Sequence, residues 1–520
     1  MPQKRPPSLY TQNNPWRSAA APGPSAAASG AEGGDKDSAE QFVGSVFKFS
    51  IATFANMFIY ALFFIITNFY VAEETLGQVE LFTGFTNTLM TVAVLGLDQA
   101  LMRFYREPPA GVSQNSLFRH CVYFSGTFLL FGMLMGSTIF ARPLYGYIGF
   151  ETVGLWVMPL LFLNAAFFLV ARYFNVLFRL EMNVKTYTIQ SIVMQFFYKL
   201  FYMVGAFFPN PDEAMMLCSA AGLGALAVVL VFIRRKTLRP HPAGLRGGVY
   251  KTVLPFGLAV APTAIFVTLN GNVAKSIITS FLGLAATGRY SFAFAMSSVV
   301  TMVQGGFAAF WAPYMYANYK THQARIMKVH DFINFVILTF FCVLVAFEDV
   351  IFWVFKQYSP SMLIFPLMMF SAVFNILTET TVHGNAIARK PIFDTIGIAL
   401  GACINFAMCF ALIPQFNLVG AAVALVIGNG ASYLLRTLTA QRLYRSIPSP
   451  GKTAMALLIG AAVAAAGTVF SGQFVVKGLC CLAAIGLYCL MYRKELVRLC
   501  KILLSLAKSV WAHLFKRGAA

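Results

Sequence analysis

Residues 254–278 read LPFGLAVAPTAIFVTLNGNVAKSII, a stretch in which Lys275 is the single charged side chain. A helix needs about 20 predominantly apolar residues to cross the hydrocarbon core of a bilayer. Similar stretches recur along the chain, and charge is confined mostly to the short gaps between them. Hydrophobic residues make up 58% of the chain and charged residues 11%, against about 25% charged in an ordinary soluble domain. The sequence therefore predicts a polytopic helical membrane protein.

We predict about fourteen transmembrane helices and exclude two other classes of protein. A soluble fold would leave too little polar surface to cover a core containing many of the 52 phenylalanines. A membrane β-barrel would show alternating segments of about 10 residues. The predicted spans are 44–70, 79–101, 119–141, 152–172, 186–208, 214–233, 252–274, 283–308, 329–347, 360–382, 392–413, 417–437, 453–471 and 474–491.

The net charge of +20 is unevenly distributed over the gaps between the spans. Lysine and arginine gather in every second gap, most densely in 234–251 and 436–452. The alternate gaps hold acids, namely Glu73, Glu74, Asp212, Glu213, Glu348 and Asp349. This distribution follows the positive-inside rule. It predicts cytoplasmic basic loops that attract anionic lipid, no binding of nucleic acid and, with an even number of spans, two cytoplasmic termini.

Motifs for metal binding or enzymatic catalysis are missing from the sequence. The nine cysteines include no CxxC pair and no Cys/His spacing typical of a metal site, so we predict no structural disulfide, no metal and no cofactor. The sequence also lacks a Walker motif and a nucleophile elbow. These absences favour a transporter over an enzyme. An integral-membrane glycosyl- or acyltransferase is the alternative, although it would need larger loops.

An internal repeat predicts two lobes. The segments LGQVELF (76–82) and TGRYSFA (287–293) each open a span after a turn glycine, and Gly77 and Gly288 are separated by 288 − 77 = 211 residues. We therefore predict a six-helix N-terminal lobe over 43–240 and a parallel six-helix lobe over 241–445. Two additional transmembrane helices follow over 446–492. Transporters are commonly built from such repeats, with the substrate site between the halves.

The two ends of the chain have different compositions. Residues 1–42 are rich in Pro, Ala, Gly and Ser, which predicts a disordered cytoplasmic tail. Residues 493–520 place leucines on one helical face and basic residues on the other. This pattern predicts a basic amphipathic helix lying on the inner leaflet.

Ionisable side chains within spans are costly and often functional. Lys275 and Arg289 flank one outer turn (280–288), and neither has an acidic neighbour in sequence. Lys199 lies deep in the fifth span. We predict that these three, with Arg103, line a cationic cavity for an anion such as a diphosphate. Alternatively, Lys275 and Arg289 extend to the outer lipid headgroups, and Lys199 pairs with a carboxylate on a neighbouring helix.

Two further sets of residues are candidates for coupling and movement. Glu379, one turn from His383, and Asp98 are candidates for ion coupling, whereas solvation at a helix end and helix capping are their structural alternatives. Pro255 and Pro262 interrupt the seventh span and predict either a hinge or a fixed kink.

Several segments resemble the Wzx-type flippases for O-antigen and exopolysaccharide, which belong to the multidrug/oligosaccharidyl-lipid/polysaccharide (MOP) superfamily. They are LGLDQALMRFYRE (95–107), LPFGLAVAPTAIFVTLNGNVAKSII (254–278), FLGLAATGRYSFAFAM (281–296) and IPQFNLVGAAVALVIGNGASYLL (413–435). The seventh span of that family usually has an acid before a base, but here Ala274 precedes Lys275. Arg289 stands where an aliphatic residue is usual, so both departures make the site more cationic.

The resemblance implies a two-lobed bundle around a central cationic cavity. It implies a flippase that moves an undecaprenyl-diphosphate-linked oligosaccharide across the bacterial inner membrane by alternating access. The implied partners are glycosyltransferases and a polysaccharide polymerase. A drug/cation antiporter and a lipid II flippase of the same superfamily are the alternative transporters.

Overall fold

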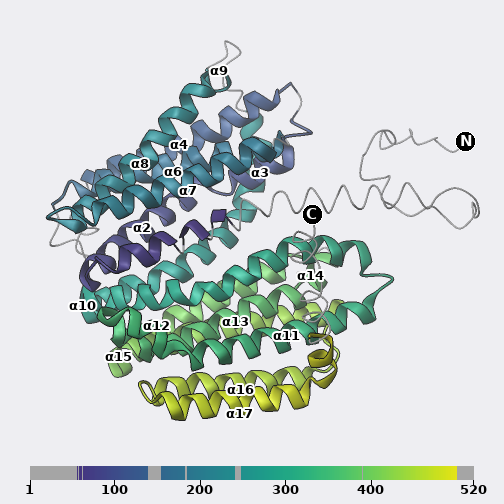
Figure 1. Ribbon diagram of the computed structural model, residues 1–520. Helices are drawn as coiled ribbons and strands as arrows, with labels where there is room; N and C mark the ends of the chain where they lie inside the picture. Colours follow the sequence, from purple (N-terminus) through teal and green to yellow (C-terminus); the bar gives the residue numbers. More distant parts are fainter. Residues whose placement is uncertain are drawn as a thin grey trace, which may run out of the picture. The chain divides into compact units, whose positions relative to one another are not determined.

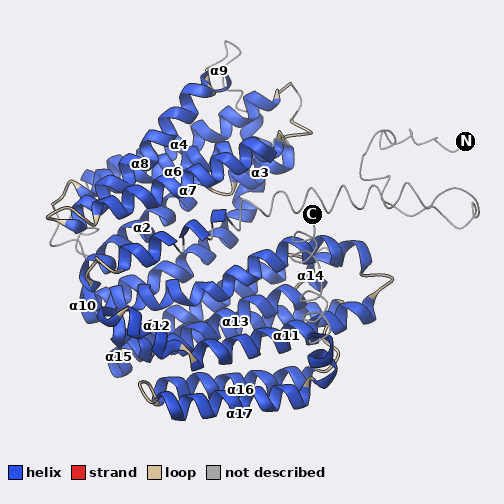
Figure 2. Ribbon diagram, in the orientation of Figure 1, coloured by secondary structure: helices blue, strands red, loops and turns tan. Residues whose placement is uncertain are grey.

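The computed structural model describes residues 55–56, 58–60, 62–109, 111–138, 154–181, 184–239, 248–388 and 390–499. Over these residues the chain is helical, with short turns and no strand (Figure 2). The predicted tail 1–42, the first residues of the first span and most of the predicted interfacial helix 493–520 lie outside the described residues.

The N-terminal lobe contains the helices from residue 58 to residue 238 (Figure 1). They are Phe58–Asn68, α2 Glu73–Val94, α3 Leu97–Phe104, α4 Gln114–Thr138, α6 Val157–Leu180, α7 Val184–Gly205, α8 Pro211–Ile233 and the short α9 Arg235–Leu238. A 47° bend separates α2 from α3. Leu95 and Gly96 have positive φ at this bend, a conformation that costs glycine little.

The C-terminal lobe contains two long helices that are interrupted by breaks in the backbone. Its helices are α10 Gly248–Asn318, α11 Gln323–Ala346, α12 Glu348–Val354, the 3₁₀ helix η1 Lys356–Leu363, α13 Phe365–Thr381, α14 His383–Ile387 and α15 Ile392–Leu443. Gly283 (φ 84°) breaks α10 and Asn417 (φ 52°) breaks α15. Thr279 and Thr287 hydrogen-bond at 2.7 Å across the first break, so the two parts of α10 form a hairpin.

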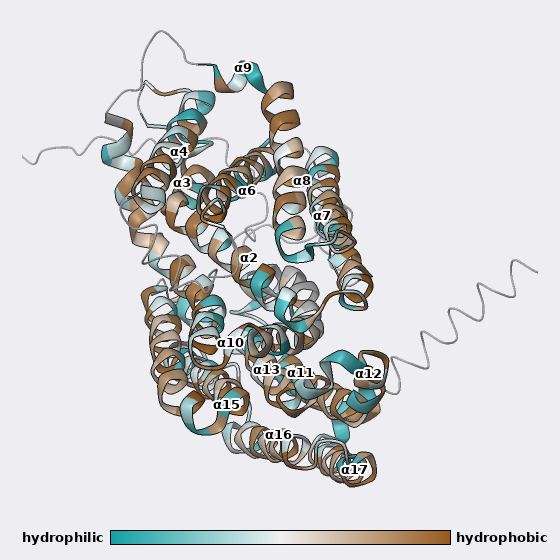
Figure 3. Ribbon diagram, turned by 90° about the vertical axis from the view of Figure 1, so that its left-hand side faces the viewer, coloured by the Kyte–Doolittle hydropathy of each residue, from teal (hydrophilic) through white to brown (hydrophobic). Residues whose placement is uncertain are grey.

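Nine of the described helices are long and apolar enough to cross a membrane, and the bent pair α2–α3 adds a tenth. Because α10 and α15 are each two spans joined at a break, they supply four of the predicted spans. Adding α7 and Phe58–Asn68 accounts for the rest. The predicted fold class is therefore confirmed: an all-α polytopic membrane protein with two six-helix lobes and two additional helices. Most helices consist largely of hydrophobic residues, whereas the basic α9 is hydrophilic (Figure 3).

The additional helices are α16 Pro450–Val469 and α17 Phe474–Met491, which pack on α11 and α13 of the C-terminal lobe. An ion cluster attaches them, in which the side chains of Lys477 and Glu348 are fully buried and that of Asp349 is 22% exposed. Lys477 Nζ of α17 lies 2.5 Å from Glu348 Oε1 and 2.6 Å from Asp349 Oδ2, at the start of α12. Burial raises the pKa of Glu348 to about 8, against the opposing effect of Lys477. Two carboxylates thus share one cation.

The backbone stays helical through Pro255 and Pro262, and Gly283 is where α10 departs from helical geometry. The neighbouring residues keep their helical conformation, so a fixed kink at the two prolines stays a prediction. A hinge role for the two prolines stays a prediction.

Candidate substrate-translocation site

The two lobes meet where α2 crosses the second part of α10. A Cβ atom added to Gly288 would lie 1.8 Å from the carbonyl oxygen of Glu73, and one added to Gly77 would lie 2.1 Å from that of Leu284. Glu73 and Leu284, like Gly77 and Gly288, differ by the repeat offset (284 − 73 = 288 − 77 = 211). The crossing is thus self-complementary, as expected for lobes related by a pseudo-two-fold axis. Only glycine allows backbones to approach so closely.

Two ion pairs join the lobes beside this crossing. Arg289 Nε lies 2.7 Å from Glu73 Oε2, and Lys275 Nζ lies 2.7 Å from Glu80 Oε2. Lys275 and Arg289, which have no acidic neighbour in sequence, therefore do have acidic partners in the structure. Their partners are remote in sequence and belong to the other lobe. The side chains of Lys275 and Glu80 are 8% and 19% exposed, so this pair is largely withdrawn from solvent.

Lys199 of α7 lies inside the N-terminal lobe, close to the same seam. Its ammonium lies 4.7 Å from the ring centroids of Tyr60 and Tyr202 and 5.5 Å from that of Tyr198. Lys199 is 7% exposed, and within the described ranges its ammonium has no carboxylate partner within 4 Å. Aromatic faces attract a cation through their quadrupoles. They hold Lys199 in place without neutralising its charge.

The inter-lobe seam continues along α2 and α3. Asn272 Nδ2 donates to the carbonyl oxygen of Gly84 at 3.1 Å and to Thr88 Oγ1 at 3.2 Å. Farther along, Gly96 lies close to Gly257. The first part of α10 therefore packs along α2 and the bend after it, from Gly84 to Gly96.

A second seam joins Phe58–Asn68 and the turn after it to the C-terminal lobe. The rings of Phe64 and Phe292 lie 5.7 Å apart, and Tyr358 Oη donates to the carbonyl oxygen of Val71 at 2.9 Å. These contacts lie near the end of the bundle that carries Glu73 and Arg289. Both seams are therefore closed at that end, which the charge pattern predicts to be the outer one.

We define the seam cluster as Glu73, Glu80, Lys199, Lys275 and Arg289. Three of its five residues are cationic and two are anionic, so the cluster carries one surplus positive charge. Lys199, Lys275 and Arg289 were predicted as site residues, and the structure brings them to one region of the inter-lobe seam.

The other predicted site residues have local partners elsewhere. Arg103 of α3 is 57% exposed and lies 3.6 Å from Glu107, so the structure does not bring it to the seam cluster. Asp98 is buried and accepts hydrogen bonds from Arg172 of α6 at 2.6 and 3.1 Å. This contact fixes α3 on α6 and favours a structural role, while ion coupling through Asp98 stays a prediction.

Glu379 of α13 contacts the C-terminal lobe's own α10. Its Oε1 accepts a hydrogen bond from Gln304 Nε2 at 2.9 Å. His383, one turn on, lies against Tyr316. The two residues thus face the inner part of α10, and a role in ion coupling stays a prediction.

Glu80 was missed by the sequence analysis. Glu73, Gly77 and Glu80 follow the i, i+4, i+7 spacing that places residues on one face of a helix. An acid inside a predicted span, on the same face as the repeat glycine, was a signal that could have identified Glu80 as a partner for a cation of the other lobe.

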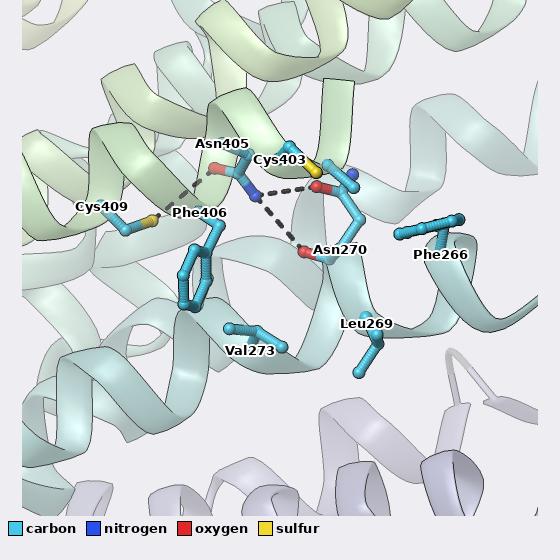
Figure 4. Close-up of a pocket in the computed structure, with 10 residues that line it drawn as sticks. Phe266, Leu269, Asn270, Val273, Cys403, Asn405, Phe406 and Cys409 are labelled. Carbon is cyan, nitrogen blue, oxygen red and sulfur yellow. Dashed lines mark hydrogen bonds between the residues drawn. The ribbon is translucent and has the colours of Figure 1, made fainter. Parts of the chain in front are cut away.

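A separate pocket lies between the first parts of α10 and α15 (Figure 4). It encloses about 220 Å³. Phe266, Val273 and Phe406 form apolar walls, and Asn405 Nδ2 donates to Asn270 Oδ1 at 2.8 Å. Asn270 in turn donates to Asn429 Oδ1 at 3.1 Å. These amides satisfy one another and join the first part of α10 to both parts of α15.

No cluster of three metal-ligating side chains occurs in the part of the chain that the structure describes. The charged side chains of the seam cluster make recognition of charge the candidate chemistry of the site.

Comparisons with known proteins find similarity at the level of structure. No family model and no curated protein matches the chain. The lipid II flippase MurJ, in an inward closed conformation, superposes with a TM-score of 0.65 at 12% identity and covers 86% of this chain and 99% of its own. The MATE multidrug transporter DinF-BH superposes with a TM-score of 0.57 at 18% identity, over 77% of this chain and 95% of its own.

An outward-facing MATE family transporter of the MOP superfamily also superposes, with a TM-score of 0.51 at 12% identity, over 76% of this chain and 94% of its own. At such low identities these likenesses concern the fold. The chain has the fold that MurJ and the MATE transporters share.

Proposed function

We propose that this protein is a flippase that moves an undecaprenyl-diphosphate-linked oligosaccharide across the bacterial inner membrane by alternating access. The observation that carries the proposal is the surplus positive charge of the seam cluster, which lies where the two lobes of a transporter fold meet. A diphosphate supplies the opposite charge. The polyprenyl tail would remain in the bilayer while the diphosphate and the sugar cross between the lobes.

Low local polarity strengthens the attraction of the cluster for an anion. Two unit charges 4 Å apart attract each other by about 4 kcal/mol at an effective dielectric constant of about 20, against about 1 kcal/mol in water. A drug/cation antiporter would need a net acidic site at the same place, so the cluster disfavours that alternative.

Lipid II is the second candidate substrate. MurJ, whose name gives lipid II as its substrate, covers 86% of this chain, whereas DinF-BH covers 77%. Both candidate substrates would present a diphosphate to the same cluster. Complementation of a strain depleted of its lipid II flippase tests this candidate, and rescue of O-antigen or exopolysaccharide export tests the first. A glycosyl- or acyltransferase activity would leave both strains uncorrected.

Alanine substitutions test the role of the cluster. Lys199→Ala, Lys275→Ala and Arg289→Ala should each reduce glycan export at least about tenfold, because hydrogen bonds to charged groups contribute about 1.5–3 kcal/mol. Export is measured in a complemented deletion strain, and membrane abundance by immunoblot. Lys320→Ala, in an exposed loop, is the matched control. Full export by all three cluster variants would contradict the proposal.

The proposed orientation predicts which loops face the cytoplasm. Single cysteines placed in 234–239 and 444–449 should react with a membrane-impermeant thiol reagent only after the cells are opened. A cysteine at Pro209 or Asn210 should react in intact cells. Labelling of the first two loops from outside would overturn the orientation inferred from the basic residues.

A further inference from the structure

One carboxylate of the seam cluster serves two ammonium groups. Glu80 pairs with Lys275 of the other lobe at 2.7 Å, and it also interacts electrostatically with Lys199 of its own lobe. One turn along α2, Thr83 Oγ1 lies 3.4 Å from Tyr198 Oη of α7. The face of α2 that carries Glu80 is therefore directed toward α7 as well as toward α10.

The two ammonium groups differ in what holds them. Lys275 belongs to α10 and moves with the C-terminal lobe, whereas Lys199 and its three tyrosines all belong to the N-terminal lobe. Any separation of the lobes at this seam breaks the pair of Glu80 with Lys275. It leaves the distance between Glu80 and Lys199 unchanged to a first approximation, since both belong to one lobe.

We propose that Glu80 is an exchangeable counterion that releases the anionic substrate from Lys199. While the seam is closed, Glu80 is occupied by Lys275, and Lys199 is free to bind a diphosphate. When the lobes separate, Lys275 leaves and Glu80 turns to Lys199, where it competes with the diphosphate. This inference rests on the proposed function and adds to it the step that weakens binding on the outer side.

The neighbouring ion pair cannot work in this way. Glu73 is held by Arg289 of the other lobe, and it has no second cationic partner among the residues that the structure describes. Both pairs close the seam, but only the pair with Glu80 also controls a free ammonium group. Glu73→Gln is therefore the matched control for Glu80→Gln.

The test is a double-mutant cycle on affinity for farnesyl diphosphate, measured by calorimetry on the purified full-length protein in detergent. Lys275→Met should lower the affinity about tenfold, because Glu80 then neutralises Lys199. Adding Glu80→Gln to Lys275→Met should restore the affinity to the wild-type value or above. Adding Glu73→Gln to Lys275→Met should not restore it. Lys199→Met should lose binding at least tenfold with or without Glu80→Gln.

The outcomes separate this inference from the proposed function. No restoration by Glu80→Gln, or equal restoration by Glu73→Gln, would overturn the counterion exchange while leaving the flippase proposal intact. Absence of binding by the wild-type protein would overturn both. If Lys275→Met does not fold, Lys275→Gln takes its place in the cycle, with the same expected loss of affinity and the same restoration by Glu80→Gln.

A second ligand distinguishes the source of the diphosphate. Inorganic diphosphate is titrated into the same variants. If Glu80→Gln restores the affinity of Lys275→Met for farnesyl diphosphate alone, the site recognises a lipid-linked anion. If it restores the affinity for both ligands, the site recognises the diphosphate group from either source.

Discussion

Replacing Gly288 by alanine should prevent the lobes from closing where α2 crosses the second part of α10, and it should reduce transport more than tenfold. The added Cβ atom would lie 1.8 Å from the carbonyl oxygen of Glu73 and 3.1 Å from the backbone nitrogen of Gly77. These are backbone atoms of the other lobe, so a side-chain rotation cannot relieve the contact. Overpacking of this kind costs about 1–3 kcal/mol, and about 1.4 kcal/mol is enough to shift an equilibrium between two conformations tenfold.

The closure can be followed with Ser291, which is buried one turn beyond Gly288. In a cysteine-free background, Ser291→Cys should react slowly with a thiol reagent added from outside, and the added substitution Gly288→Ala should speed this reaction. Gly271→Ala is the control, because it lies in the same helix and its Cβ atom would meet nothing within 4 Å. Alanine has a higher helix propensity than glycine at both sites. A loss of closure that occurs with Gly288→Ala alone must therefore come from the contact between α2 and the second part of α10. Equal effects of the two substitutions would exclude this explanation.

Replacing Lys477 by methionine should detach α16 and α17 from the C-terminal lobe or unfold the protein. Lys477, Glu348 and the carboxylate of Asp349 form a cluster in which Lys477 is fully buried. Removing one partner of a buried ion pair costs about 3–5 kcal/mol, because the remaining charge is left without a partner. Thermal unfolding in detergent, with cleavage of the exposed α16–α17 segment by protease, measures the effect.

The defect should depend on pH in a definite direction. The pKa of Glu348 is already raised by burial to about 8 from 4.5, and loss of Lys477 should raise it further. A carboxyl group whose pKa is raised in the folded state stabilises that state at low pH. This stabilisation is lost as the pH rises through the pKa of the folded state. The stability deficit of Lys477→Met should therefore be larger at pH 9 than at pH 5. The triple variant Lys477→Met, Glu348→Gln, Asp349→Asn should recover most of the stability, since no buried charge remains. Equal melting of the single and triple variants would refute the ionic attachment.

The spans and the lobe repeat could be predicted from the sequence because both depend on local patterns. An apolar stretch of sufficient length predicts a span wherever it occurs in the chain. Gly77 and Gly288 were matched because the residues around them in sequence are similar. The structure places these two glycines against each other, which explains why the same short pattern occurs in both lobes.

The ion pairs could not be predicted in the same way. Glu80 and Lys275 are 195 residues apart, and Glu73 and Arg289 are 216 residues apart. A net charge or a hydropathy profile carries no information about which helices meet. Lys275 and Arg289 could thus be identified as important cations while their partners remained unknown. For the same reason Asp98 could not be assigned to Arg172.

The most direct test of the account is a reversible cross-link across the outer seam. Glu73→Cys and Arg289→Cys, in a cysteine-free protein, are joined by a short bifunctional thiol reagent, and movement of an undecaprenyl-diphosphate-linked sugar is measured in proteoliposomes. The matched control joins Glu181→Cys and Arg234→Cys, an ion pair of the same 2.7 Å length within one lobe. We predict that the inter-lobe cross-link stops the residual transport of this variant, which lacks Arg289, that reduction returns transport to its rate before cross-linking, and that the control cross-link has little effect. Transport at an undiminished rate with the seam locked would contradict alternating access between these lobes.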